Sequence, residues 1–404
     1  MADRRVDHLL IGGGIAAATC AQVLAERGDG ASILLVGREL DPPYHRPPIT
    51  KGYLAGAEGK DDALIALPDA VEVLTRTSVM ALDPAAKTVT LSTKETVEYG
   101  TALIATGAMV RRLPVDGAQL EGIHYLRALA NADTLRADVE GAEHVVCVGG
   151  SYIGCEVAAT LTALGKQCTV VLQEEEPLER GFGLQVGAWV RSLLESHGVE
   201  VVSGVEVERF EGNGAAEDER VARVVLAGGR TLPADAVVCG VGANPDVMLA
   251  RKAGLEIGPQ GGVRADAQLR ALGAEGLFVA GDMCEYDSPV HGRTVRIEHE
   301  EVAAAHGRTA AANMLGANAE HTTVPYFWSD LADWATLEYV GPAEGWDEEV
   351  VEGDLASGAF AVWYLRDGRV AAMLRAGGHG DLDRAAALIA SGEAVSAEGL
   401  TAGV

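Results

Sequence analysis

The residues whose types and spacing could do chemistry in this chain form two glycine clusters, each placed after an apolar run. The first cluster is GGGIAA at 12–17, and the second is GGSYIG at 149–154. In such a cluster the first glycine makes a tight turn, the second lets a pyrophosphate approach the backbone, and the third small residue packs a helix on the strand. The N-terminus of that helix favours the negative charge of phosphates. Each cluster therefore predicts a dinucleotide site, although either could be a glycine turn without a ligand.

An acidic residue follows each cluster at the distance where a carboxylate would bind the ribose hydroxyls. Glu39 lies 22 residues after the first cluster, and Glu174 lies 20 residues after the second. The strand before Glu174 ends at the apolar residue Leu172, so Glu174 can take this role only if the strand end bends. Ser151 replaces the middle glycine of the second cluster, and its hydroxyl can bond a phosphate oxygen.

Two dinucleotide sites in one chain suggest FAD in one site and NAD(P)H in the other. ALIATG at 102–107 and LFVAGD at 277–282 match the second and third flavin segments of two-dinucleotide flavoproteins. An aspartate at a strand end, such as Asp282, can accept a hydrogen bond from the ribityl chain of a flavin. Because these segments follow the first cluster in the expected order, we assign FAD to that cluster.

The elements that must position these residues form a βαβ pattern that occurs twice, and the chain is expected to be of the α/β class. The first pattern spans 6–37 and the second spans 145–172, with its helix at 154–164. Beyond them we expect helices at 186–197 and about 300–315, and strands near 199–210, 221–226, 236–242 and 276–282. From residue 324 the pattern is strand-like, with a hairpin turn at Asp367-Gly368 and a short helix at 381–390 that ends the ordered part.

Composition and charge exclude several classes of function. The 404 residues suffice for two or three domains, and the formal charge of −27 disfavours nucleic acid or an anionic membrane as a partner. No run is apolar enough to span a membrane, and Asp7 and His8 interrupt the start of a possible signal peptide. The six cysteines show no CxxC or metal spacing, so we expect no metal site and a reduced, cytoplasmic setting.

The proline-rich segment PPYHRPPITKGYL at 42–54 carries the most specific resemblance to a known family. Together with GGSYIGCEVA, VGANPD, FVAGD, RIEHEE and YFWSDL, it resembles the FAD-dependent ferredoxin reductase family of the putidaredoxin and rhodocoxin reductase type, which is related to monodehydroascorbate reductase and apoptosis-inducing factor. The resemblance implies two Rossmann-like domains, with the NAD domain inserted in the FAD domain, and a C-terminal α+β domain. The implied bounds are 1–113 and 244–322 for the FAD domain, 114–243 for the NAD domain and 323–404 for the C-terminal domain.

The resemblance also implies contacts to both cofactors, FAD and NADH. Those to FAD would come from Gly12, Gly13, Gly14, Ile15, Ala16, Ala17, Glu39, Arg46, Lys51, Val79, Thr106, Gly107, Arg127, Asp282, His299 and Trp328. Those to the nicotinamide nucleotide would come from Gly150, Ser151, Tyr152, Ile153, Glu174, Arg180, Gly242 and Glu298. Two alternatives stay open, in which Val79 and Trp328 are core residues and Arg127 and Arg180 are solvated surface charges.

Three residues are the catalytic candidates that the resemblance implies. Lys51 and Glu156 would pair beside the flavin, and Tyr152 would cover the flavin ring and yield to nicotinamide. A helix that starts near His299 could aim its positive end at the flavin. Neither Cys20 nor Cys155 has a cysteine neighbour at a useful spacing, which excludes a disulphide reductase.

The leading hypothesis is therefore an NADH-dependent reductase that passes electrons to a 2Fe–2S ferredoxin of an oxygenase system. The alternatives are a reductase of a small molecule, such as a radical or quinone, and a flavoprotein that acts mainly by partner binding, as apoptosis-inducing factor suggests. Glu174, with Glu175 and Glu176 beside it, predicts a preference for NADH over NADPH, and Arg180 is the only nearby cation that could weaken it.

Overall fold

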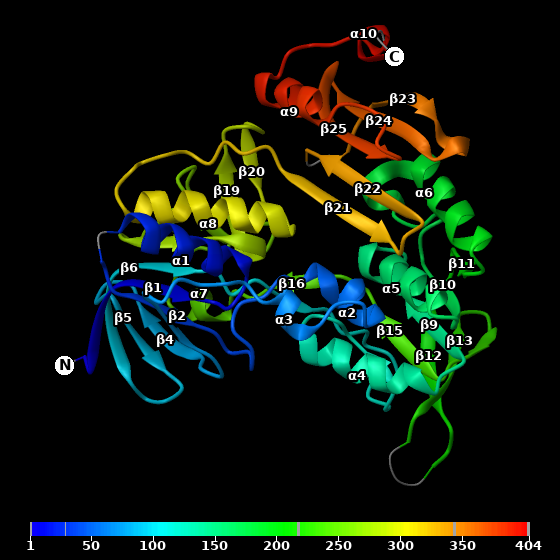
Figure 1. Cartoon of the computed structure of the whole chain (residues 1–404), viewed down its shortest axis with the longest axis horizontal. Coiled ribbons are helices and arrows are strands. Elements are labelled where there is room, and N and C mark those ends of the chain that lie inside the picture. The colour runs from blue at the N-terminus through cyan, green and yellow to red at the C-terminus, as the bar shows by residue number, and fades with distance from the viewer. Residues whose placement is uncertain (1, 29, 216–218, 342–344, 402–404) are drawn as a thin grey trace. The chain divides into compact units, whose positions relative to one another are not determined.

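The computed structural model describes residues 2–28, 30–215, 219–341 and 345–401, and its chain divides into two compact units. Unit 1 comprises Met1–His45, Ala63–Met109 and Asn244–Phe327, and unit 2 comprises Arg46–Asp62, Val110–Ala243 and Trp328–Val404. Each unit therefore combines segments that lie far apart in the sequence, as the colours in Figure 1 show.

Unit 1 is built on a sheet with the strand order β3-β2-β1-β6-β5-β4, in which β18 lies beside β6. Strands β1, β2, β3, β6 and β18 are parallel, whereas β4 and β5 run antiparallel to their neighbours. Buried apolar runs such as ILLV in β2 are typical of parallel strands that are covered on both faces. The strands are β1 (Arg4–Ile11), β2 (Ile33–Val36), β3 (Val71–Leu74), β4 (Val79–Asp83), β5 (Thr88–Leu91), β6 (Thr96–Ile104) and β18 (Leu277–Val279).

Helices α1 (Ile15–Arg27) and α8 (Glu300–Met314) pack together on one face of this sheet (Figure 1). They approach closely because Gly307 has no side chain, since a Cβ atom there would lie 2.3 Å from the carbonyl oxygen of Ala16. The remaining elements of unit 1 and its boundaries are β7 (Ala108–Val110), β16 (Ala243–Pro245), β17 (Val263–Ala265), β19 (Cys284–Ser288), β20 (Arg293–Val295), α3 (Lys60–Ala63), α7 (Met248–Lys252) and the short 3-10 helix η2 (Gly281–Met283).

Unit 2 repeats the parallel arrangement in a sheet with the order β11-β10-β9-β15-β8, and adds the antiparallel sheet β12-β13-β14. The strands are β8 (Ile123–His124), β9 (His144–Val148), β10 (Gln167–Val171), β11 (Glu200–Val202), β12 (Val207–Gly212), β13 (Val221–Leu226), β14 (Thr231–Pro233) and β15 (Ala236–Cys239). The helices are α2 (Gly52–Ala55), α4 (Leu129–Glu140), α5 (Tyr152–Ala163), α6 (Glu179–Ser196) and the 3-10 helix η1 (Pro47–Thr50).

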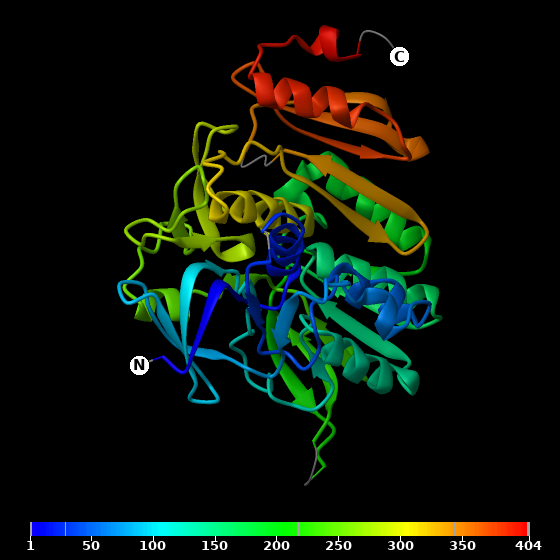
Figure 2. The ribbon, with the colours of Figure 1, turned by 60° about the vertical axis from the view of Figure 1, so that its left-hand side comes forward.

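The C-terminal part of unit 2 is an antiparallel sheet with the order β21-β22-β25-β24-β23. Figure 2 shows α9 on one face of this sheet and α6 on the other. Its elements are β21 (Tyr326–Leu331), β22 (Ala335–Val340), β23 (Glu348–Asp354), η3 (Leu355–Ser357), β24 (Ala359–Arg366), β25 (Arg369–Ala376), α9 (Leu382–Ser391) and α10 (Ala397–Thr401).

Two expectations from the sequence were wrong. Ordered structure continues beyond 390, because Arg384 donates to the carbonyl groups of Gly399 and Leu400 and so ties α10 to α9. Helix α6 begins at Glu179 rather than near 186, with a kink at Gly183, where the φ angle is 80°.

Candidate functional site

The first glycine cluster lies at the end of β1 in unit 1. A Cβ atom at Gly12, where φ is +137°, would lie 2.1 Å from the carbonyl oxygen of Ala105, so only glycine lets these two strand ends cross. Nothing lies within 4 Å of a Cβ atom built on Gly14, which is the N-cap of α1 and makes no side-chain capping bond. No side chain caps the N-terminus of α1, and the turn leaves space beside Gly14, which fits a pyrophosphate.

Two further strand ends converge on this cluster. The N–H of Ala105, after β6, donates to Ile11 at 2.8 Å, and the N–H of Ala280, after β18, donates to Ile104 at 3.0 Å. Ligands bind beyond the carboxyl ends of parallel strands. The structure thus brings the three predicted flavin segments, which contain residues 12–17, Thr106–Gly107 and Asp282, to one edge of the sheet.

The side chains at this edge are held by hydrogen bonds within unit 1. Thr106 donates its hydroxyl to the carbonyl oxygen of Asp246 at 2.6 Å, and its N–H contacts the sulfur of Met283, which adjoins Asp282. Tyr44 donates its hydroxyl to the carboxylate of Glu39. The expected ribose ligand is therefore already oriented by the proline-rich segment.

His299, Glu298 and Val79 also lie in unit 1. The ring of His299 stacks on Phe327, with 4.0 Å between the ring centroids, and burial lowers the pKa of His299 to about 4. His299 is consequently neutral at pH 7 and stands as the N-cap of α8. Glu298 pairs with Arg296, and Val79 packs against the core of the unit, as its structural alternative predicted.

The second glycine cluster occupies the matching place in unit 2, at the end of β9. A Cβ atom at Gly149 would lie 2.3 Å from the carbonyl oxygen of Gly240, and one at Gly154 would lie 1.9 Å from that of Gly149. Ser151 donates its hydroxyl to the carbonyl oxygen of Gly240 at 2.9 Å. This bond holds the hydroxyl at the turn, and the contact of Ser151 with a phosphate oxygen stays a prediction.

The neighbouring residues complete this turn. Ser151 is the N-cap of α5 and makes no side-chain capping bond. The first N–H groups of this helix, those of Tyr152 and Ile153, therefore have no side-chain cap, as at the first cluster. Gly242 has a φ angle of +94°, and nothing lies within 4 Å of a Cβ atom built on it. The N–H of Leu178 donates to the carbonyl oxygen of Gly150 at 2.8 Å, which ties the start of α6 to the turn.

The acidic residues after β10 are paired with two arginines. Glu174 forms an ion pair with Arg180 at 2.5 Å, and Glu176 forms one with Arg191 at 2.6 Å. Arg191 overturns the expectation that Arg180 is the only nearby cation. The sequence offered no signal for Arg191, because the long α6 helix carries it back to the acidic segment only in the folded chain.

Lys51 and Glu156 meet in unit 2, as expected. The Nζ atom of Lys51 lies 2.7 Å from Oε1 of Glu156, and both side chains are largely buried. The carboxylate also accepts hydrogen bonds from the hydroxyl groups of Thr50 at 2.6 Å and Ser329 at 2.7 Å. Sequence reasoning missed these two donors, although Ser329 lies among the buried positions of β21, where an inward-facing hydroxyl is a usable signal.

Tyr152 lies beside this pair on α5 and packs edge-to-face on Phe182, with 5.8 Å between the ring centroids. Burial raises the pKa of Tyr152, so its phenol is protonated at neutral pH. Arg46 donates to the carbonyl oxygen of Arg127, and Trp328 alternates with the inward-facing residues of β21.

All six cysteines are buried and unpaired, and burial raises the pKa of every one of these thiols. The described residues contain no cluster of His, Cys, Asp and Glu that could hold a metal ion. Among the same residues, no helix has both the length and the apolar character needed to cross a membrane.

Two glycine turns at the carboxyl edges of two parallel sheets, together with a buried Lys–Glu pair, define a flavoprotein that uses a pyridine nucleotide. Residues 6–307 match the family model described as pyridine nucleotide-disulphide oxidoreductase, and residues 326–402 match the model described as reductase C-terminal.

Curated relatives and solved structures agree with these models. A 5,5'-dehydrodivanillate O-demethylase ferredoxin reductase subunit from Sphingobium sp. is 34% identical over 91% of this chain and 89% of that protein. The ferredoxin–NAD(+) reductase subunit of a benzene 1,2-dioxygenase system from Pseudomonas putida is 34% identical, over 90% and 88%. A crystal structure of the covalent putidaredoxin reductase–putidaredoxin complex matches with a TM-score of 0.92 and 30% identity, covering 100% of this chain and 97% of that one.

The chain belongs to the pyridine nucleotide-disulphide oxidoreductase family, among its ferredoxin reductases. The resemblance that the motifs indicated is therefore confirmed, as is the α/β fold class with a reductase C-terminal domain. The family's cofactors are FAD and NADH. The two glycine turns fit these cofactors, and the six cysteines are free and buried.

Proposed function

We propose that this protein takes a hydride from NADH onto bound FAD and passes the electrons to a 2Fe–2S ferredoxin that serves an oxygenase. The observation that carries the proposal is the occurrence, in one chain, of two glycine turns and six free, buried thiols. With no cysteine pair to receive them, electrons from the flavin must leave to an external acceptor. The relatives named above are ferredoxin reductase components of oxygenase systems, which favours a ferredoxin.

Each part of the chain takes a role in this proposal. Residues 1–113 and 244–322 bind FAD, residues 114–243 bind the nicotinamide nucleotide, and residues 323–404 form the C-terminal domain. FAD, when bound, supplies the ring that accepts the hydride. The first turn holds its pyrophosphate, Glu39 binds a ribose and Asp282 binds the ribityl chain. We place the protein in the cytoplasm, which the six unpaired cysteines support.

Lys51 supplies a fixed positive charge beside the reacting ring, and Glu156 holds it there. A buried cation is tolerated only when it is paired, and Glu156 in turn accepts bonds from two hydroxyl groups. Tyr152, protonated and packed on Phe182, excludes water from the ring until nicotinamide displaces it.

An acceptor screen tests the proposal. The FAD-loaded protein is given NADH and, in separate reactions, a 2Fe–2S ferredoxin, a quinone and an organic radical, and turnover of each is measured. We expect the ferredoxin to be reduced with the highest kcat/KM. Faster turnover of the quinone or radical would make the protein a small-molecule reductase. A long-lived charge-transfer complex with NADH and slow turnover of every acceptor would indicate a partner-binding flavoprotein instead.

A further inference from the structure

Residues 178–183, here named the α6 start segment, contact the second glycine turn and the acidic segment that follows β10. Leu178 donates its N–H to the carbonyl oxygen of Gly150 at 2.8 Å, and Arg180 pairs with Glu174 at 2.5 Å. Phe182 packs on the ring of Tyr152. The position of this short segment thus sets the position of the groups proposed to bind the nicotinamide nucleotide.

The backbone of the α6 start segment departs from helical geometry at both ends. Leu178 has a φ angle of 58°, in the left-handed region that residues other than glycine rarely adopt, and Gly183 has a φ angle of 80°. The conformation of Leu178 persists only where surrounding contacts hold it, whereas glycine adopts a positive φ readily. A Cβ atom at Gly183 would lie 2.4 Å from a carboxylate oxygen of Glu349 in β23, so the C-terminal sheet lies directly against the kink.

Tyr364 of β24 supplies the contact that holds this kink. Its buried hydroxyl donates to the backbone carbonyl oxygen of Phe182 at 2.8 Å. The side chains of β24 alternate, so that Tyr364 and Phe360 face α6 while Trp363 faces α9, where Arg384 lies over its ring. The bond from Tyr364 therefore joins the C-terminal sheet to the α6 start segment, beside the ring contact of Tyr339 in β22 with Phe182 at 5.4 Å between centroids.

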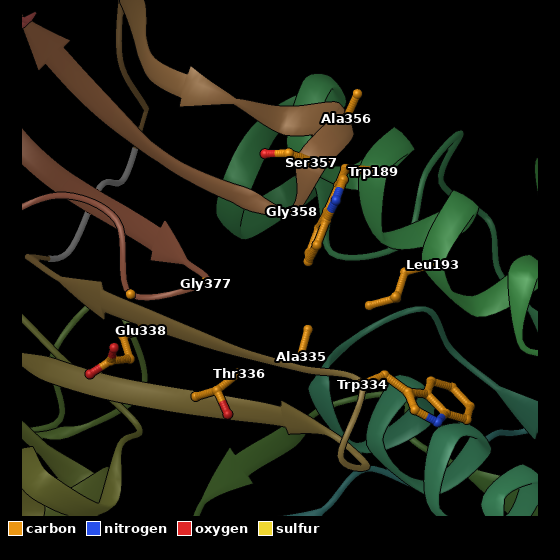
Figure 3. A pocket seen from close by; sticks show the side chains of 11 residues that line it. Trp189, Leu193, Trp334, Ala335, Thr336, Glu338, Ala356, Ser357, Gly358 and Gly377 are labelled. Atoms are coloured by element: carbon orange, nitrogen blue, oxygen red, sulfur yellow. The ribbon is translucent and has the colours of Figure 1, made fainter. Parts of the chain in front are cut away.

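Farther along α6 the contact with the sheet is looser. Trp189 packs edge-to-face on Phe360, with 5.0 Å between centroids. Beyond this pair lies a hollow of about 400 Å³, lined by Trp189, Leu193 and Trp334 among others (Figure 3). The contact between the C-terminal sheet and α6 that lies near the nucleotide turn is therefore the one at the α6 start segment.

We infer that Tyr364 is a positioning residue for the pyridine nucleotide, acting from the C-terminal sheet through the carbonyl of Phe182. This rests on the proposed function, in which unit 2 binds NADH. Without the hydroxyl, the carbonyl of Phe182 loses a hydrogen bond, and the α6 start segment spends only part of its time in the binding conformation. The apparent Kd then rises by the inverse of that fraction.

The test compares Tyr364→Phe with Trp363→Phe in the FAD-loaded protein. Trp363→Phe is the matched control, because it removes a buried hydrogen bond to Glu352 from the opposite face of the same strand. We expect Tyr364→Phe to raise two constants about tenfold. These are the KM for NADH, measured with ferricyanide as acceptor, and the Kd for NAD⁺, measured by calorimetry. The kcat should stay within twofold of the wild-type value. Trp363→Phe should change the KM and the Kd by less than twofold, although it should lower the Tm.

Hydrogen exchange supplies a second readout, since Tyr364→Phe should speed exchange of the amides of 178–183 and leave those of β1 and β6 unchanged. If Tyr364→Phe does not fold, Phe182→Leu tests the same segment and should also raise the KM. Unchanged KM and Kd in either folded variant, or an equal rise in Trp363→Phe, would overturn the inference. A wild-type protein that binds no NAD⁺ would instead overturn the proposed function, and this inference with it.

Discussion

Glu156 has the most constrained carboxylate of the proposed site, since it accepts from Lys51, Thr50 and Ser329. We expect Glu156→Ala to slow flavin reduction by NADH at least tenfold while FAD stays bound. The physical reason is that Lys51 loses its partner, and a hydrogen bond to a charged group contributes about 1.5–3 kcal/mol. Stopped-flow absorbance of the flavin measures the rate.

Glu338→Gln is the control for this prediction, because it breaks another ion pair of unit 2, with Arg375, at 2.7 Å. That variant should reduce flavin at the wild-type rate. If Glu156→Ala reduced its flavin at the wild-type rate, Glu156 would have only a structural role.

Glu174 is the residue on which we expect nucleotide preference to depend. Its carboxylate can accept hydrogen bonds from a ribose 2′-hydroxyl, and it repels a 2′-phosphate. We expect NADH to be preferred over NADPH by about 100-fold in kcat/KM, which corresponds to roughly 2.8 kcal/mol at about 1.4 kcal/mol for each tenfold. Arg180 is exposed, so its pairing with Glu174 is too weak to remove this preference.

Steady-state kinetics with both nucleotides, in wild type and Glu174→Ala, measure this preference. Glu174→Ala should lose most of it. Equal use of NADPH by the wild type, or an unchanged preference in the variant, would show that another group selects the nucleotide.

The sequence predicted individual residues unevenly. The pairing of Lys51 with Glu156 followed from the resemblance, although the two lie 105 positions apart. Thr50, Ser329 and Arg191 were missed, because only the folded chain brings them to their carboxylates. The hydrogen bond from Ser151 to the carbonyl oxygen of Gly240 was also missed, because only the folded chain brings these two residues together.

At the scale of elements, strands and glycine turns were the most predictable features. The steric need for glycine at Gly12 and Gly149 is local, since both turns follow a buried strand. The true start of α6 was not predictable, because left-handed Leu178 and the kink at Gly183 are held by contacts with Gly150 and Tyr364 from elsewhere in the chain. Helix α10 was missed for the same reason, since Arg384 of α9 fixes it.

Helix α8 and the segment after it bury histidines that make unit 1 sensitive to acid. His321 is fully buried, with Nδ1 3.0 Å from the hydroxyl of Thr309, and burial lowers its pKa to about 4. An unfolded histidine titrates near pH 6.5, so the unfolded chain binds the proton first as pH falls. The contribution of His321 to the free energy of unfolding is fully present above about pH 6.5 and decreases between that pH and pH 4. About 2 kcal/mol of it is lost at pH 5. Burial lowers the pKa of His306 as well, which acts in the same direction.

Thermal unfolding at pH 7.5 and pH 5 measures this loss. We expect a lower Tm at pH 5 in the wild type and a smaller difference between the two values in His321→Gln. The same difference in both proteins would assign the acid sensitivity to other groups.

At the scale of the whole molecule, the account depends on one chain carrying two dinucleotide folds and no cysteine pair. The fold class and family were predictable because the motifs recur in a fixed order along nearly the whole sequence. The electron acceptor was not predictable to the same degree, since the charge of −27 argues against an acidic partner while the relatives are ferredoxin reductases.

Cofactor content follows from the same architecture. Because unit 1 brings three flavin segments to one sheet edge and unit 2 carries the other turn, we expect one FAD for each chain. The ratio of flavin absorbance to protein in the purified enzyme measures it. A folded, colourless protein that takes up no FAD would contradict the assignment of the first turn.

The central claim is that electrons pass from NADH through FAD to a ferredoxin. Sequential-mixing stopped flow under anaerobic conditions tests it most directly, with NADH added first and an oxidised 2Fe–2S ferredoxin second. The account predicts rapid bleaching of the flavin by about one equivalent of NADH, followed by its reoxidation as the ferredoxin is reduced. A flavin that NADH does not bleach, or a reduced flavin that no 2Fe–2S ferredoxin reoxidises, would contradict the account.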